Sequence, residues 1–153
     1  MIVVSDTSPL TAMLTVGVAD MLPTIFGEVV VPEAVRHELL RNHPVLPGWL
    51  RVEVVRNPGR ASHYADTVDT GEAEAIELAI ELKADRLLID ERKGRKLAAQ
   101  EGIPVIGLLG VVLLAKRSQL IPSARALLQR LDQEAGMYLG ADIREAALKT
   151  VGE

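Results

Sequence analysis

Short apolar runs alternate with longer amphipathic stretches along the whole chain. The runs are rich in Val, Ile and Leu and bounded by polar or turn-forming residues, which predicts buried strands. The predicted strands are Ile2–Ser5, Val29–Val31, Val52–Val55, Arg86–Ile89 and Pro104–Ile106. Strands that alternate with helices form parallel βαβ units. The pattern therefore predicts an α/β fold, a three-layer α/β/α sandwich with a central, mainly parallel sheet.

The stretches between the strands repeat their apolar residues with helical periodicity. The predicted helices are Pro9–Val16, Glu33–Arg41, Glu72–Lys83, Lys93–Gln100, Leu108–Lys116, Ser123–Gln133 and Ala141–Val151. Ser8 followed by Pro9 is typical of an N-cap and the first helical position. Prolines and glycines are frequent between Asn42 and Gly71, which predicts that this segment is mostly loop.

Composition narrows the class of protein. A chain of 153 residues, 48% hydrophobic and 25% charged, predicts a single domain over 1–153 with C-terminal helices (about 123–151) packed on it. The absence of cysteine excludes disulfides, thiolate metal sites and thiol nucleophiles, and the three histidines show no ligand-like pairing. The net charge of −4 gives no overall attraction to nucleic acid.

No segment predicts insertion into a membrane. The longest apolar stretch, Ile103–Ala115, is too short to span a bilayer and contains Pro104. Met1 leads directly into a predicted strand, with no basic and apolar leader before it. We therefore expect a cytoplasmic protein that has no membrane partner.

Two of the predicted strands run into acids. Asp6 follows Ile2–Ser5, and Asp90 and Glu91 follow Arg86–Ile89. Ligands of open α/β sheets bind beyond the carboxyl ends of the strands, so Asp6 and Asp90 are expected at one edge. Asp6 could instead cap the next helix or form an Asx-turn. Because Asp90 and Glu91 are adjacent, they point in different directions; we favour Asp90 as the ligand and hold Glu91 in reserve.

Two further acids are expected close to this edge. Glu72 lies at a helix start, where Asp69 and Glu72 have the spacing of a capping box. It falls in line with the buried stripe, opposite a face of Glu74, Glu77 and Glu81 that we expect to be solvated. That helix returns its N-terminus to the edge near Asp90. Glu38 lies at the inner margin of its helix, although it could equally form a surface pair with Arg41.

Clustered carboxylates repel one another unless a cation compensates their charge. Oxygen ligands without His or Cys favour Mg²⁺ or Mn²⁺, and such ions support phosphodiester cleavage. The basic residues Arg92, Lys93, Arg95 and Lys96 follow directly. Their position at a helix start opposes the helix dipole, which suggests phosphate contacts, but a solvated basic face is an equal alternative.

Five ordered segments together resemble a PIN domain, and more narrowly the small prokaryotic PIN-like proteins of the DUF3368 type, which are similar to VapC-type toxins. The segments are Val4–Leu10, Val31–Val35 with Glu38, Gly71–Ile76, Leu88–Arg95 and Val105–Val111. The resemblance covers nearly the whole chain. It departs from the family pattern at Glu72, where many relatives have Asp, and at Leu108, where relatives often have Thr or Ser.

The resemblance implies a metal-dependent ribonuclease, with RNA as substrate and with an antitoxin protein or a second copy of the chain as expected partners. Its four acids fall on Asp6, Glu38, Glu72 and Asp90, which would be the catalytic residues and the metal ligands. We assign Ser8, Arg92, Lys93 and Arg95 as candidate substrate-binding residues.

Two other functions fit the sequence. A strand-end Asp followed by Thr is similar to the aspartate nucleophile of haloacid-dehalogenase-like phosphatases, but those enzymes carry a second Asp where this chain has Ser8. The acids could also belong to a non-catalytic module that binds a metal or a protein.

Overall fold

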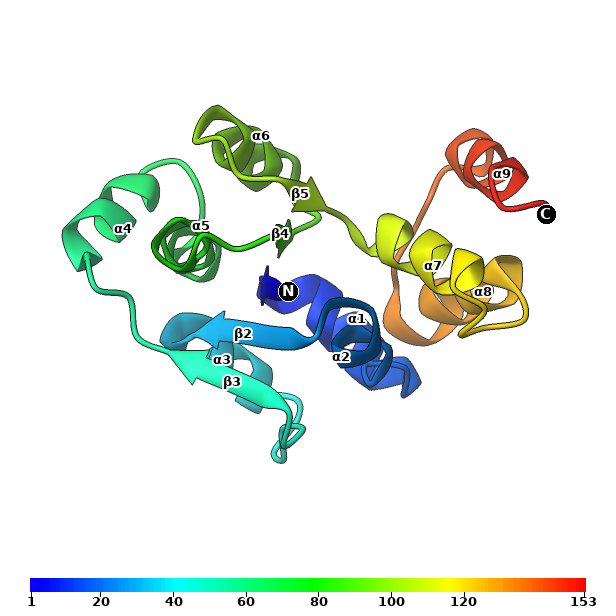
Figure 1. Ribbon diagram of the computed structural model, residues 1–153, viewed down its shortest axis with the longest axis horizontal. Helices are drawn as coiled ribbons and strands as arrows, with labels where there is room; N and C mark the ends of the chain where they lie inside the picture. Colours follow the sequence, from blue (N-terminus) through cyan, green and yellow to red (C-terminus); the bar gives the residue numbers. More distant parts are fainter.

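The computed structural model describes residues 1–153 and centres on one five-stranded sheet (Figure 1). Every neighbouring pair of strands is parallel, and the strand order is β3-β2-β1-β4-β5. The strands are β1 (Ile2–Ser5), β2 (Glu28–Pro32), β3 (Leu50–Glu53), β4 (Arg86–Leu88) and β5 (Val105–Ile106). All five predicted strands are present, with boundaries that move by one or two residues.

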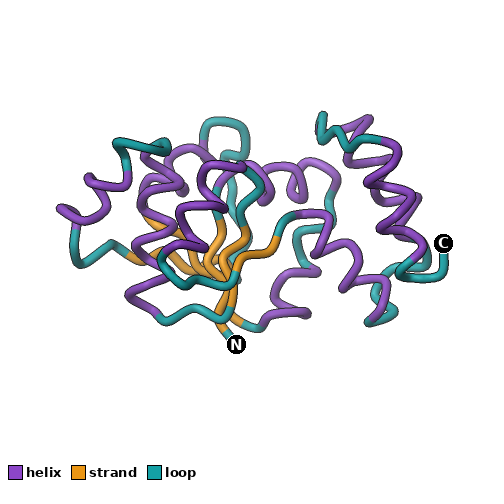
Figure 2. Tube along the Cα trace, turned by 90° about the horizontal axis from the view of Figure 1, so that it is seen from above, coloured by secondary structure: helices purple, strands orange, loops and turns teal.

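Helices cover both faces of this sheet, which confirms the predicted three-layer sandwich (Figure 2). The helices are α1 (Thr7–Val16), α2 (Met21–Phe26), α3 (Glu33–Leu40), α4 (Pro58–Tyr64), α5 (Thr70–Leu82), α6 (Arg92–Gln100), α7 (Leu108–Arg117), α8 (Ala124–Ala135) and α9 (Ala141–Lys149). Figure 1 shows α4, α5 and α6 at one end of the molecule and α7, α8 and α9 at the other.

The two faces of the sheet build two separate cores because successive strand residues point to opposite sides. Val3 packs with α1, α2, α7 and α8 in one cluster of 21 buried residues. Val4 packs with α5 and α6 in another cluster of 14. Asp6 and Glu72, two of the few buried charged residues, lie outside these clusters, after β1 and at the start of α5.

Two helices were absent from the predictions. The segment Asn42–Gly71, expected to be mostly loop, contains α4, and α2 lies between the first two strands. The prediction for α4 was wrong because the prolines and glycines of the segment suggested turns. Pro58 instead occupies the first turn of the helix, and the Asn57 side chain caps it by accepting a hydrogen bond from the Arg60 N–H at 3.0 Å.

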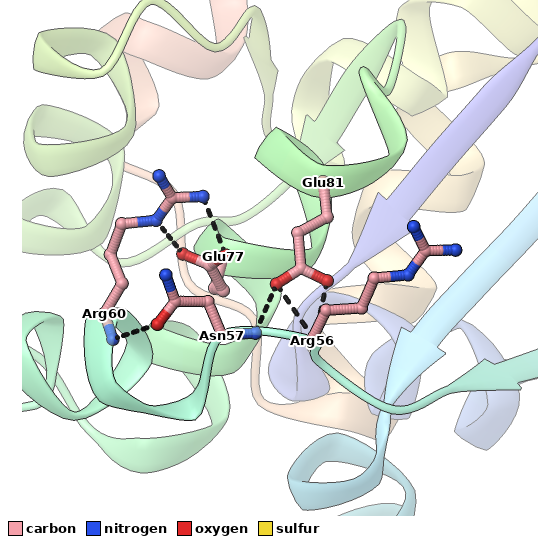
Figure 3. Close-up of polar contacts among 5 residues, drawn as sticks. All are labelled: Arg56, Asn57, Arg60, Glu77 and Glu81. Carbon is pink, nitrogen blue, oxygen red and sulfur yellow. Dashed lines mark hydrogen bonds and ion pairs between the residues drawn. The ribbon is translucent and has the colours of Figure 1, made fainter.

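A buried acid holds α4 against α5 (Figure 3). Glu77, expected on a solvated face, is fully buried and accepts hydrogen bonds from Arg60 Nε at 2.5 Å and Nη2 at 2.8 Å. One turn on, Glu81 accepts hydrogen bonds from the Arg56 and Asn57 backbone N–H groups. Our prediction for Glu77 was wrong because α4, remote in sequence, covers that face of α5.

The last two helices are joined by a polar clasp. Glu153 accepts hydrogen bonds from the Ser123 hydroxyl and from the Ala124 N–H, at the start of α8. Arg125 of α8 pairs with Glu145 of α9 at 2.7 Å. Four residues of α8 are buried, whereas Leu148 is the only buried residue of α9. None of the helices has the length and apolar character needed to cross a membrane.

Candidate metal centre

The centre of the sheet is a topological switch point. From β1 the chain places β2 and β3 on one side and β4 and β5 on the other. Such a reversal opens a crevice at the carboxyl ends of the central strands, where ligands of open α/β sheets bind. Asp6 directly follows β1, and Asp90 lies two residues beyond β4. The two acids therefore stand on neighbouring strands at the crevice.

Asp6 joins the sheet to a helix without a loop. Its N–H donates to the Leu88 carbonyl at 2.9 Å, which continues the pairing of β1 with β4. Asp6 itself occupies the N-cap position of α1, but its side chain makes no capping hydrogen bond. The prediction of Ser8 as N-cap was wrong because the helix begins directly after the strand. The residue is only 5% exposed; burial raises the pKa of the Asp6 carboxyl, and a hydrogen bond from the Thr7 backbone N–H opposes that shift.

Glu72 lies in the first turn of α5. Asp69 caps this helix by accepting a hydrogen bond from the Glu72 N–H at 2.8 Å, which confirms that half of the predicted capping box. The Glu72 residue is 6% exposed, and its Oε2 is buried without a hydrogen-bond partner. A buried carboxylate oxygen with no partner is costly, which makes Glu72 a candidate to hold a ligand.

Three of the acids rest against glycines. A Cβ added at Gly71 would lie 2.6 Å from Glu38 Oε1, one at Gly94 would lie 2.5 Å from Glu72 Oε2, and one at Gly107 would lie 2.8 Å from Asp90 Oδ1. These glycines lie at the starts of α5, α6 and α7. The bare backbone at each position leaves the space that the carboxylate occupies.

The Asp90 carboxylate is oriented by backbone. Its Oδ1 accepts a hydrogen bond from the Leu108 N–H, at the start of α7, at 2.9 Å. Arg95 lies beside it and donates to the Ile89 carbonyl at 3.3 Å. The residue as a whole is exposed, but loss of water around the carboxyl raises the pKa of Asp90, while the Leu108 hydrogen bond and the Arg95 charge oppose that shift.

The acids act on one another electrostatically. Burial, with smaller contributions from the charges of Asp69, Glu38 and Asp90, raises the pKa of Asp6 from 3.8 to about 7. Burial, followed by the neighbouring Asp69 carboxyl and the charge of Asp6, raises the pKa of Glu72 from 4.5 to about 8. Asp6 thus feels the charges of Glu38 and Asp90, and Glu72 feels those of Asp6 and Glu91.

No protein cation neutralises the two buried acids of the crevice, Asp6 and Glu72. Neither Asp6 nor Glu72 forms an ion pair with Lys, Arg or His, and Glu38 does not form the surface pair with Arg41 that was its alternative. As the side chains stand, no three Asp, Glu, His or Cys residues come close enough to hold a metal ion. The carboxylates lie around the crevice without converging on one point.

Of the candidate substrate-binding residues, Arg95 and Ser8 lie next to Asp90. Arg95 donates to the Ile89 carbonyl, next to Asp90. Ser8 is exposed and lines the same cavity as Asp90. Lys93 faces a different groove, which it lines with Lys96, Asp66 and Thr67. Arg92 is exposed and forms no ion pair.

Two residues at the crevice escaped the sequence analysis as site residues. Asp69 was considered only as a cap, although its charge acts on both Asp6 and Glu72. Thr7 carries a buried hydroxyl, Oγ1, without a hydrogen-bond partner. Its position directly after Asp6 was the available signal for Thr7, and the capping-box spacing was the signal for Asp69.

These residues fit a hard divalent cation. The donors at the crevice are carboxylate and hydroxyl oxygens, the ligands that Mg²⁺ and Mn²⁺ prefer. Glu72 Oε2 and Thr7 Oγ1 are buried without partners. The N-termini of α1, α5 and α6 start within two residues of Asp6, Glu72 or Glu91, and their dipoles help to hold negative charge there.

One comparison with known proteins identifies a family. The family model DUF3368, described as a PIN domain, matches residues 2–153. No curated protein matches the chain.

Proposed function

Because the chain belongs to the DUF3368 family of PIN domains, which are nuclease-type folds, we propose that it is a metal-dependent ribonuclease. In this proposal the crevice at the ends of β1 and β4 binds Mg²⁺ or Mn²⁺ and hydrolyses the phosphodiester bonds of RNA. Asp6, Glu38, Glu72 and Asp90 are its metal ligands, with Glu91 in reserve.

One observation carries the proposal. Asp6 and Glu72 are nearly fully buried, repel each other and have no cationic partner in the chain. A folded protein loses stability by keeping such a pair ionised without compensation. A divalent cation bound between the carboxylates removes that cost.

Each residue has a defined task in this proposal. Asp6 and Glu72 hold the cation from the floor of the crevice, while the Leu108 N–H keeps the Asp90 carboxylate in one orientation. Arg95, beside Asp90, neutralises charge on the phosphate, and the Thr7 hydroxyl oxygen is a further ligand for the cation. When bound, the cation supplies Lewis-acid polarisation of the phosphate and activation of water.

Calorimetric titration with Mn²⁺, combined with an RNA cleavage assay on the same samples, tests the proposal. Wild type is expected to bind Mn²⁺ and to cleave RNA, whereas Asp6→Asn and Asp90→Asn lose both without loss of the fold. Asp132→Asn is the matched control, because Asp132 is an exposed acid of α8 whose side chain forms no hydrogen bond or ion pair. Cleavage by Asp6→Asn at the wild-type rate would remove Asp6 from the mechanism.

A non-catalytic module that binds a metal or a protein is the second candidate. The observation in its favour is that no three acids stand ready to hold a metal ion. Binding of Mn²⁺ without cleavage of any RNA would support this function. Absence of Mn²⁺ binding would make the acidic edge structural and would overturn the nuclease proposal.

A role as the toxin of a toxin–antitoxin pair extends the ribonuclease proposal. If the chain is such a toxin, its expression in a bacterial host arrests growth, and Asp6→Asn relieves the arrest at an equal protein level. Growth arrest by both proteins would separate toxicity from the acidic crevice.

A further inference from the structure

A cavity opens beside the acidic crevice. It has a volume of about 370 Å³ and lies between α1, the start of α7 and the connection from α8 to α9 (136–140). Asp90 and Ser8 line it from the crevice side, and small residues, Ala12 and Ala135, leave room in its wall. No Lys or Arg lines it, so a phosphate held at the crevice has no counter-charge inside the cavity.

The rim of this cavity carries an exposed aromatic ring. Tyr138 lines the cavity and is 78% exposed. The other aromatic residues are engaged elsewhere: Phe26 and Tyr64 are buried, and the Trp49 N–H donates to Asp20 at 2.8 Å. In a chain with 3% aromatic residues, an exposed ring beside a candidate active site is suited to stack on a planar ligand.

The connection also offers free polar groups. The backbone N–H groups of Tyr138 and Leu139 donate no hydrogen bond within the chain, and the Ser8 hydroxyl has no partner. An aromatic ring next to free backbone donors suits a planar heteroaromatic ring, which presents a face for stacking and an edge with hydrogen-bond acceptors.

From this arrangement we propose that the cavity binds one unpaired nucleobase of the substrate strand, with Tyr138 as its stacking platform. The inference rests on the proposed ribonuclease function, because a phosphate at Asp90 places the adjoining nucleoside at the cavity mouth. A base can enter only after it has left its pair and its stack. The cavity therefore selects single-stranded RNA over a duplex.

Titration with nucleoside monophosphates tests the site without any cleavage. The probes are AMP, GMP, CMP and UMP, and the readout is the NMR signal of the Met137 methyl group, which lines the cavity, together with the Tyr138 ring protons. At least one nucleotide is expected to shift both sets of signals upfield, as a ring current from a stacked base would. Tyr138→Ala abolishes the Met137 shift, and Tyr138→Phe retains it.

Binding of RNA gives the second test. A short fluorescein-labelled RNA of mixed sequence, single-stranded or annealed to its complement, is titrated against proteins that carry Asp6→Asn to prevent cleavage. Tyr138→Ala is expected to weaken single-strand binding roughly 5- to 150-fold, the range for loss of one stacked base. Duplex binding stays unchanged. Tyr138→Phe and the control Ile143→Ala, an apolar α9 residue 60% exposed, remain within about twofold of the parent.

The outcomes separate this inference from the ribonuclease proposal. Equal single-strand affinity for Tyr138→Ala and its parent, or equal losses for single strand and duplex, overturns the base site alone. Wild type that binds single strands through Tyr138 but cleaves none keeps the base site and overturns the ribonuclease proposal. A third outcome is that no nucleotide shifts the Met137 signal and that Tyr138→Ala dissociates a dimer. The cavity is then covered by a second copy of the chain, and the base site is overturned.

Discussion

The positions of the carboxylates at the crevice depend on neighbouring glycines. Gly94→Ala would normally stabilise a helix by about 1 kcal/mol. At this position the new methyl group lies 2.5 Å from Glu72 Oε2 and 2.6 Å from Ile89 Cδ1. We expect a loss of roughly 1–3 kcal/mol in the free energy of unfolding, together with weaker Mn²⁺ binding. Thermal unfolding and calorimetry measure both effects.

Gly140→Ala is the control for this substitution, because a Cβ at Gly140 meets no atom within 4 Å. A Gly94→Ala protein that is more stable than wild type and binds Mn²⁺ equally well would show that Glu72 moves away freely. In that case the glycine has no part in the site.

The raised pKa values of Asp6 and Glu72 predict how stability depends on pH. Their folded pKa values are about 7 and 8, against ordinary values of 3.8 and 4.5. The folded state therefore binds protons more tightly than the unfolded chain, and stability falls as pH rises from about 4 to about 8. Glu81, Glu145 and Glu153 have lowered pKa values and act below their ordinary 4.5, outside this window.

Metal-free protein should accordingly be more stable near pH 5 than near pH 8, by on the order of 3 kcal/mol in the free energy of unfolding. Its unfolding temperature is therefore expected to be higher at pH 5. Asp6→Asn removes much of this difference. Mn²⁺ stabilises the protein more at pH 8, because its ligands must be ionised. Scanning calorimetry in the presence of a chelator, and then with Mn²⁺, provides the comparison; a metal-free protein more stable at pH 8 contradicts the assignment.

At the scale of elements, an ion pair between the buried Glu77 of α5 and the half-exposed Arg60 helps to hold α4 to α5 (Figure 3). Arg60→Ala leaves the Glu77 carboxylate fully buried without its partner, which is strongly destabilising. We expect a fall in Tm of more than about 5 °C. Arg56→Ala is the matched control, because the Arg56 side chain forms no ion pair and only its backbone N–H binds Glu81. Equal Tm values for the two variants would contradict this role.

Elements were predictable from sequence where the pattern is local. Val3 and Val4 predict a buried strand, and the spacing of Asp69 and Glu72 predicts a helix start, because each pattern lies within a few residues. The partner of Glu77 is Arg60, 17 residues away in the sequence. The local pattern shows only that Glu77 shares a helical face with other acids, which is typical of a solvated face. At the crevice, sequence order placed Asp6 and Asp90 on one edge, but the buried Thr7 hydroxyl and the charge of Asp69 required the packed structure.

Charge across the whole molecule is unevenly placed. The chain has a net charge of −4, yet α6 presents Arg92, Lys93 and Lys96 without ion pairs, and Lys93 and Lys96 line one groove. Lys93→Ala should weaken the binding of all RNA sequences alike and reduce the slope of log affinity against log salt by about 0.7. Lys149→Ala, on exposed α9 surface, is the control. Titrations over a range of salt concentrations measure the slope, and an unchanged slope would place Lys93 off the RNA path.

The final helix, α9, is held to the rest of the molecule mainly by the polar clasp with α8. Its single buried residue and its contacts through Glu145 and Glu153 allow α9 to open locally at much lower cost than global unfolding. Opening releases one end of the 136–140 connection and hence one wall of the Tyr138 cavity. Amide hydrogens of α9 should therefore exchange faster than those of α5, and a ligand held in the cavity should slow the exchange of a helix that it does not touch.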